Sequence, residues 1–222
     1  KMRDYGLLSG APNGLSHSLG LYTDELTYYG SAVSASDFYA NTLTSTDSEL
    51  KALWTTSYNQ IYAANAIIMG LDNSTSISSA DRDLIKGEAL FVRALLHFYL
   101  TNLYGAVPYI TTTDYTVNSK VGKQSVDAVY ALLKEDLNEA VLLLPTDYVS
   151  NGRTRPNVFT AHALLARVNL YMGLWAEAAN EASAVLNQTE LFGLTTIEGT
   201  FKIDSPATLW QLGFSNDFTA TK

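Results

Sequence analysis

The chain contains no cysteine among its 222 residues. Disulfide bonds, thiolate metal sites and cysteine nucleophiles are therefore excluded for this sequence. Its three histidines, His17, His97 and His162, lack the short spacing that metal-binding histidines usually have. We therefore expect no metal site and no cofactor.

Positive charge and long apolar runs are also scarce. Lys and Arg number 14 against 22 Asp and Glu, which gives a net charge of −8 and a pI near 4.8. No basic run offsets this acidic background, so the sequence argues against nucleic-acid binding. No uncharged apolar run reaches the length of a membrane-spanning helix, and no signal peptide opens the sequence.

The common catalytic motifs are missing too. There is no G-x-S-x-G, no H-E-x-x-H, no Walker lysine and no G-x-G-x-x-G after a predicted strand. Neighbouring acids such as Asp24 with Glu25, or Glu135 with Asp136, supply the two carboxylates that glycoside hydrolysis needs. With 22 acidic residues such neighbours arise by chance, and adjacent acids on a helix point apart. We predict that the protein is not an enzyme.

The longest apolar-periodic segment is residues 79–104. Ser78 and Asp81 have the form of a capping box at its start. Gly105 supplies a left-handed stop at its end, and Pro108 prevents the helix from resuming. The sequence therefore predicts one helix of about seven turns.

One narrow face of this predicted helix is polar. It carries Lys86, Arg93, His97 and Thr101, whereas apolar residues cover most of the remainder. We predict a central helix that solvent wets along this thin stripe. Glu88 lies nearly opposite Arg93, so each is expected to have a partner on another element, and for Glu88 a structural role is favoured over a catalytic one.

Two further long helices are predicted. Thr46 and Glu49 form a second capping box before a helix of about 23 residues, whose apolar face includes Trp54. After an extended loop, Ser125 caps another helix that ends at Pro145. We assign Trp54 to the core because it keeps the spacing of that face.

The segment that begins at Thr160 contains two apolar-periodic helices with a hinge at Gly173. Small residues follow the hinge and allow close helix approach. An aromatic residue, Trp175, stands two positions after this glycine. This pattern resembles a tetratricopeptide repeat, so we predict that Trp175 packs in the repeat core.

Residues 87–111, GEALFVRALLHFYLTNLYGAVPYIT, resemble the signature segment of the SusD/RagB family, outer-membrane nutrient-binding lipoproteins of Bacteroidetes. The positions that match are Glu88, Ala89, Phe91, Arg93, Ala94, Tyr99, Gly105, Val107 and Pro108. The W…Y-x-x-I-x-x-AN run at Trp54, Tyr58, Ile61, Ala64 and Asn65 is also similar to the family, as is the GRTRPN loop at residues 152–157.

The resemblance implies an all-α fold of tetratricopeptide-like helical repeats with irregular loops and short extended segments. The repeats are expected at about residues 47–190, with irregular structure at 1–46 and 191–222. The resemblance further implies that the sequence covers mainly the N-terminal half of a SusD-like protein and that the family's C-terminal part is not present.

The resemblance also implies a function. Family members bind nutrient at the cell surface, most often oligosaccharide or polysaccharide, and deliver it to a SusC-like TonB-dependent transporter in polysaccharide utilization. They are held at the outer membrane by a lipid anchor, whose cysteine would lie upstream of Lys1. Peptide capture, as in RagB-like members, and a generic tetratricopeptide-like peptide-binding scaffold remain alternatives.

Ligand contacts are expected on residues 27–46, which we predict to form a long loop. Tyrosine has a flat apolar face and a hydroxyl, which suit sugar stacking as well as packing. The candidate ligand-binding residues are Tyr28, Tyr29, Asp37, Phe38, Tyr39 and Asn41. The alternative is that the four aromatic residues only hold the loop on the helices.

Overall fold

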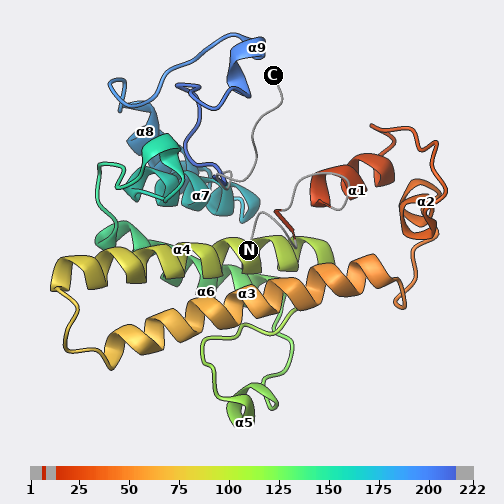
Figure 1. The fold of residues 1–222 in the computed structure, drawn as a ribbon, viewed down its shortest axis with the longest axis horizontal. Coiled ribbons are helices and arrows are strands. Elements are labelled where there is room, and N and C mark those ends of the chain that lie inside the picture. The colour runs from red at the N-terminus through yellow and green to blue at the C-terminus, as the bar shows by residue number, and fades with distance from the viewer. Residues whose placement is uncertain (1–6, 9–13, 214–222) are drawn as a thin grey trace. The chain divides into compact units, whose positions relative to one another are not determined.

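The computed structural model describes residues 7–8 and 14–213. It divides into two compact units, Lys1–Ile61 and Tyr62–Lys222, which are described separately. Among the described residues every regular element is a helix, and the one β-type pairing is an isolated antiparallel bridge between Val107 and Gln124. The predicted all-α fold is confirmed, and Figure 1 shows the order of the helices.

The first unit contains α1 (Leu15–Tyr22), α2 (Val33–Tyr39) and the first part of α3 (Ser48–Asp72). The prediction of one long loop over residues 27–46 is wrong, because α2 lies within it. Ser34 on α2 donates to both carboxylate oxygens of Asp47, at 3.0 and 2.9 Å. This pairing ties α2 to the start of α3.

Asp47 also caps α3. Its Oδ1 accepts from the backbone N–H groups of Glu49 and Leu50, at 2.9 and 3.0 Å. The predicted capping box at Thr46 is therefore wrong by one residue, since the hydroxyl of Thr46 pairs with that of Thr44 instead. A carboxylate at this position suits the positive end of the helix dipole.

The second unit is built on four helices: α4 (Ser79–Tyr104), α6 (Val126–Leu143), α7 (Val158–Tyr171) and α8 (Trp175–Leu186). Successive members pack on each other, α4 on α6, α6 on α7 and α7 on α8. The predicted caps are confirmed at Ser78 and Ser125, whose hydroxyls accept from backbone N–H groups of the first turn. Gly105 ends α4 with φ of 73°, as predicted for the stop position.

The pair α7 and α8 forms the predicted helix–turn–helix of a tetratricopeptide-like repeat. Gly173 makes the turn with φ of 73°, a left-handed conformation that favours glycine. The prediction that Trp175 packs in the core is wrong, because 68% of its surface is exposed. Trp175 is the first residue of α8, and the packed face of that helix begins one turn later, at Ala178.

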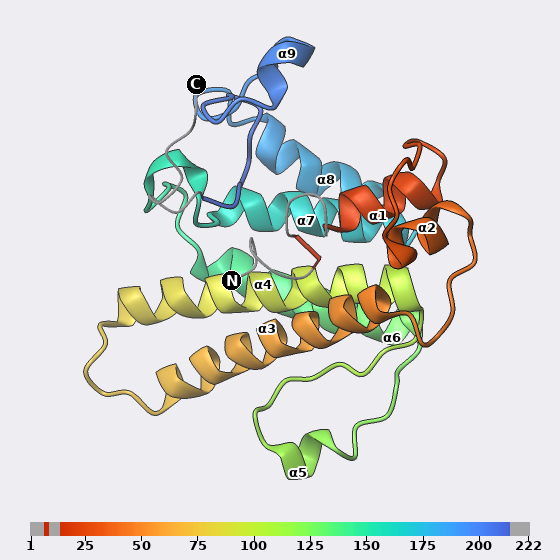
Figure 2. The same ribbon diagram turned by 45° about the vertical axis from the view of Figure 1, so that its right-hand side comes forward.

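Shorter helices interrupt the connections: α5 (Tyr115–Asn118) between α4 and α6, a 3-10 turn at Asn151–Arg153, and α9 (Ile197–Thr200). Figure 2 shows the loop that carries α5 standing out from the α3 and α6 ribbons. The irregular segment after α8 returns to the 3-10 turn, where Arg153 donates to the carbonyl of Leu191 at 2.6 Å. Within residues 7–8 and 14–213, none of the helices is long and apolar enough to cross a membrane.

Candidate functional site

The polar stripe on α4 is not wetted by solvent. Arg93, His97 and Thr101 are all buried, so this prediction is wrong. The stripe faces α6, where Lys86 pairs with Glu139 at 2.6 Å and Arg93 pairs with Asp136. A second helix, together with the segment after Pro108 that contacts His97, therefore covers the face that helical periodicity left open.

Arg93 is the centre of a buried cluster that we name the α4 polar network: Asn65, Arg93, His97, Tyr109 and Asp136. The guanidinium binds both oxygens of Asp136, Nε to Oδ2 at 2.7 Å and Nη2 to Oδ1 at 2.6 Å. Its Nη1 donates to Asn65 Oδ1 at 2.8 Å, and the Tyr109 hydroxyl donates to Asp136 Oδ2 at 2.6 Å. The network thus joins α3, α4, α6 and the segment after Pro108.

The charges of this network are matched. Burial opposes the charge on Arg93, but the hydrogen bonds and negative charge of Asp136 outweigh it and raise the pKa of Arg93. Burial, reinforced by Asp136, also raises the pKa of Tyr109, so its hydroxyl stays protonated and donates. Asp136 is therefore bound within the network and is not free to act with Glu135 as a catalytic pair.

His97 is fully buried in the same network. Its ring stacks on Tyr109 with centroids 3.9 Å apart, its Nδ1 lies 2.9 Å from the carbonyl of Arg93, and its Nε2 accepts from Ile110 N–H at 3.3 Å. Burial, together with the nearby Arg93 charge, lowers the pKa of His97 to about 4. The imidazole is neutral and its two nitrogens serve as backbone partners, which is a structural role.

Glu88 has the separate partner that the sequence predicts. Its oxygens accept from Arg155 Nε at 2.7 Å and Nη2 at 2.8 Å. The hydrogen bonds with Glu88 are the main cause that raises the pKa of Arg155. This ion pair links α4 to the loop before α7, so its role is structural.

In the first unit, Tyr28 closes a tight turn. Its hydroxyl donates to the carbonyl of Ala32 at 3.1 Å and accepts from the N–H of the same residue. Its ring lies against Gly30, where a Cβ would come within 2.8 Å of the ring carbons. Tyr28 is half-buried and therefore fixes the backbone on either side of Tyr29.

Tyr29, at the tip of this turn, is 92% exposed, and Tyr39, at the end of α2, is 38% exposed. Asn41 follows α2 with φ of 55° and is exposed. Asp37 is partly exposed and accepts from Thr42 Oγ1 at 3.2 Å. These four side chains are open to a ligand.

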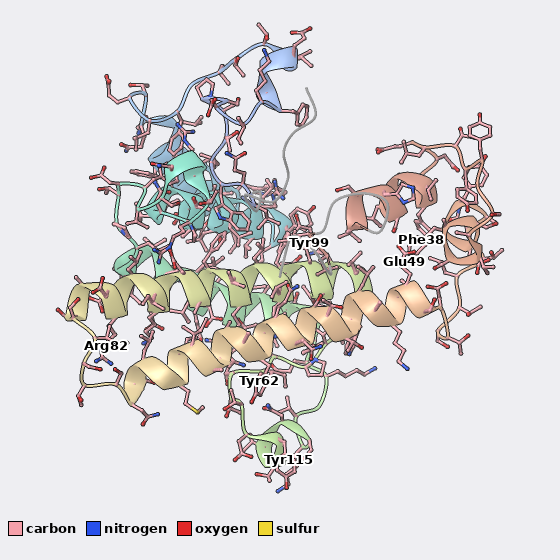
Figure 3. All side chains as sticks on the ribbon, viewed as in Figure 1. Phe38, Glu49, Tyr62, Arg82, Tyr99 and Tyr115 are labelled. Atoms are coloured by element: carbon pink, nitrogen blue, oxygen red, sulfur yellow. The ribbon has the colours of Figure 1, made fainter. Side chains whose placement is uncertain are left out.

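Phe38 is not open to a ligand, because only 3% of its surface is exposed. Of the candidate ligand-binding residues, Phe38 therefore lies in the core of the first unit. α2 is the reason: in a helix, neighbouring residues point in different directions, so Phe38 faces the core while Tyr39 faces solvent. Figure 3 labels Phe38 on α2 and Glu49 at the start of α3.

Several exposed aromatic side chains in the second unit were missed by the sequence reading. Four of them lie on helices, Tyr62 on α3, Tyr115 on α5, Tyr171 on α7 and Trp175 on α8, and a fifth, Phe201, directly follows α9. Figure 3 shows Tyr115 on the α5 loop and Tyr62 on α3. Their signal in the sequence is position: three of the four stand at the first or last residue of a helix, where the packed face is incomplete.

The described part of the chain contains no group of three or more His, Asp or Glu side chains arranged to hold a metal ion. Trp54, which the sequence assigns to the core, is half-buried and lies 4.9 Å from Tyr58, centroid to centroid. Among the candidate residues of the first unit, two tyrosine rings, one amide and one carboxylate are thus at least partly open to solvent: Tyr29, Tyr39, Asn41 and Asp37.

The chain is similar to proteins of one family over most of its length. A SusD-like family model, described as starch-binding and associating with the outer membrane, matches residues 12–170. SusD-like protein P25 of Formosa agariphila is 25% identical over 168 residues, which are 74% of this chain and 32% of that protein. SusD-like protein P2 of the same organism is 32% identical over 149 residues, which are 65% and 28%.

Solved structures give the same result. A SusD superfamily protein from Bacteroides vulgatus matches with a TM-score of 0.74 and 25% identity, over 87% of this chain and 42% of that one. A SusD-like carbohydrate-binding protein from the same species matches in fold with a TM-score of 0.76 over 94% of this chain and 48% of that one. The chain thus spans about a third of the curated relatives it matches and under half of these structures. It belongs to the SusD-like family.

Proposed function

We propose that this protein binds nutrient glycan at the outer-membrane surface and delivers it to a SusC-like TonB-dependent transporter. The family description, starch-binding and associating with the outer membrane, supports this proposal. The observation that carries it is the display of Tyr29, 92% exposed, on a turn that Tyr28 closes.

The geometry of the turn suits a sugar ring. The C–H face of a sugar packs on a flat aromatic ring, and nearby polar groups fix its hydroxyls. Tyr29 and Tyr39 supply rings, while Asn41 and Asp37 supply an amide and a carboxylate. Because the Tyr28 hydroxyl already holds the backbone at Ala32, little ordering is left to oppose binding.

The proposal includes a lipid anchor and a longer protein. Family resemblance supports a lipid-modified cysteine that holds the protein at the outer membrane. Because the chain covers 32% of P25, we propose that it forms the N-terminal part of a SusD-like fold and that further residues complete the ligand site. Titration of one glycan into this chain and into the longer protein tests this, with weaker binding expected for the chain alone.

Peptide capture is the second candidate. The helix–turn–helix of α7 and α8 favours it, because repeats of this type present peptide-binding surfaces. Against it, the four open candidate residues, Tyr29, Asp37, Tyr39 and Asn41, include no Lys or Arg to pair with a peptide carboxylate. A charged group is the usual means of fixing a peptide terminus.

A glycan array with a peptide mixture as counter-screen separates the two candidates. We expect the protein to retain one class of neutral polysaccharide and no peptide. The same glycan should release no new reducing ends during incubation with the protein, since we propose binding without hydrolysis. Retention of peptides alone would contradict the proposal and favour the second candidate.

A further inference from the structure

Aromatic side chains gather where α4 and α7 end. Phe98 of α4 is buried and makes edge-to-face contacts with Tyr171 of α7, at 5.2 Å between centroids, and with Tyr130 of α6, at 6.2 Å. Three helices thus place three rings around one point. Phe98 and Tyr130 are buried, whereas Tyr171 is exposed to solvent.

Asn102 lies in this layer with its amide orientation set by the protein. Its Oδ1 accepts from the Tyr130 hydroxyl at 3.0 Å, and its Nδ2 donates to the carbonyl of Phe98 at 2.7 Å. The side chain is exposed, and one N–H of the amide is left for a further acceptor. Burial is the main cause that raises the pKa of Tyr130, so its hydroxyl remains a donor to Asn102.

Tyr171, whose ring contacts Phe98, and Trp175, four residues later, are exposed aromatic residues on either side of one turn. Tyr171 is the last residue of α7 and 58% exposed, and Trp175 is the first residue of α8. A three-residue turn joins them, with Gly173 in the left-handed region. The Trp175 ring reaches back over that turn, to 3.8 Å from the position a Cβ on Gly173 would occupy. Two large rings are therefore displayed on a fixed turn.

We propose that Asn102, Tyr171 and Trp175 form a second glycan-binding site, separate from the tyrosines of the first unit. This inference rests on the proposed function. Exposed Trp and Tyr faces with a neutral amide donor match the C–H faces and hydroxyl oxygens of an uncharged sugar. None of the three side chains carries a charge, so the site selects neutral glycans over acidic ones.

The rest of α8 argues against a covering helix at this place. Five of its six other exposed positions are small or polar, and the sixth is Leu186 at the last position: Ala176, Glu177, Ala179, Asn180, Ser183 and Leu186. A helix face that is buried by a neighbour normally carries a broad apolar stripe. Trp175 instead stands at the start of a largely polar face, as a ligand contact does.

A second site would act on long ligands more than on short ones. A polysaccharide that reaches two sites on one protein binds more tightly than either site alone allows, because the second contact is intramolecular. A short oligosaccharide occupies one site at a time. Chain length is therefore the variable that the experiment should change.

The test compares Trp175→Ala and Tyr171→Ala in the full chain, with Tyr115→Ala as the matched control. Tyr115 is 79% exposed in the same unit but lies outside the site. Affinity electrophoresis uses the neutral polysaccharide that the array identifies. We expect each site variant to lose about tenfold or more in affinity, as for an anchoring aromatic residue, and the control to be unchanged.

Fluorescence gives a readout that does not depend on the first site. In a Tyr29→Ala background, we expect the polysaccharide to change the tryptophan emission, and Trp175→Phe to remove that change. Unchanged affinity of the site variants, or loss of the emission change with Tyr29→Ala alone, would overturn the second site while leaving the proposed function intact. Failure of the wild-type protein to bind any glycan would overturn the proposed function and the second site together.

Discussion

The α4 polar network and the segment from Tyr28 to Asn41 contain similar mixtures of aromatic and polar side chains, but they use them in opposite ways. In the network, Arg93 donates two hydrogen bonds to Asp136, and the Tyr109 hydroxyl donates a third to the same carboxylate. In the segment, Tyr28 is bound to its own turn, and Tyr29 is left exposed without a partner among the described contacts. The first arrangement stabilises the fold, and the second leaves exposed the side chains that we propose as ligand contacts.

This difference teaches what residue spacing can and cannot indicate. Spacing predicts which side chains share a face of a helix, and it does so correctly for Arg93 and His97. Whether another element covers that face depends on contacts far apart in the sequence. Asp136 is 43 residues from Arg93 in the sequence, and no local pattern predicts their contact.

The strongest test of the comparison removes one member of the network. Asp136→Ala leaves the Arg93 charge buried without its carboxylate, so we expect a loss of about 3–5 kcal/mol in the free energy of unfolding. Urea denaturation measures this loss. The double variant Arg93→Met, Asp136→Leu removes both charges and should be clearly more stable than the single variant; an equal or greater loss would show that charge pairing is not what the network contributes.

The pH dependence of stability tests His97. Its pKa in the folded state is lowered to about 4, whereas in the unfolded chain it is near 6.5. The unfolded state therefore binds the proton first, so this contribution is fully present above the unfolded pKa and is lost as pH falls toward the folded pKa. Linkage gives a loss of about 2 kcal/mol between about pH 7 and about pH 5.

The variant His97→Gln isolates this effect from the carboxylates that also titrate on acidification. Denaturation at several pH values measures the free energy of unfolding. This free energy should fall more steeply with falling pH in the wild type than in the variant. Equal pH slopes for the two proteins would mean that His97 is not held neutral by burial.

A smaller effect is expected where the ion pair is partly exposed. Glu88 and Arg155 bind through two hydrogen bonds, but solvent reaches both side chains. We expect Glu88→Ala to cost about 1 kcal/mol in the free energy of unfolding, after allowance for solvent screening. A cost as large as that of Asp136→Ala would remove the distinction between the two ion pairs.

The smallest effect is expected at the exposed aromatic residues. Trp175→Ala should change the free energy of unfolding by less than about 0.5 kcal/mol, because most surface substitutions have effects of this size. Phe98→Ala in the same region should cost about 3–5 kcal/mol, since it empties a buried aromatic site. Thermal melts of the two variants measure the contrast, and similar shifts for both would place Trp175 in the core after all.

Much of the fold is predictable because helix ends are local. The caps at Ser78 and Ser125 and the turn glycines Gly105 and Gly173 depend on residues within one turn of each other, and all four predictions are confirmed. The cap of α3 shows the limit: Thr46 and Asp47 are both suitable residues, and the contact with Ser34 selects Asp47.

The candidate site is less predictable because exposure depends on what lies opposite. Spacing alone places Trp175 on the packed face of α8, yet the helix begins packing only at Ala178. Phe38 and Tyr39 are adjacent and similar in chemistry, and only the presence of α2 assigns one to the core and the other to solvent. The sequence thus indicates which aromatic residues are candidates for ligand contact, but it does not indicate which of them are buried in the fold and which are exposed.

The central claim is that Tyr29 serves the ligand while Phe38 serves the fold, and calorimetric titration of Tyr29→Ala and Phe38→Ala tests it most directly. The ligand is the glycan that the array identifies, and a thermal melt accompanies each titration. We predict that Tyr29→Ala lowers the affinity about tenfold or more with an unchanged melting temperature, and that Phe38→Ala lowers the melting temperature. Wild-type affinity in Tyr29→Ala would contradict the claim.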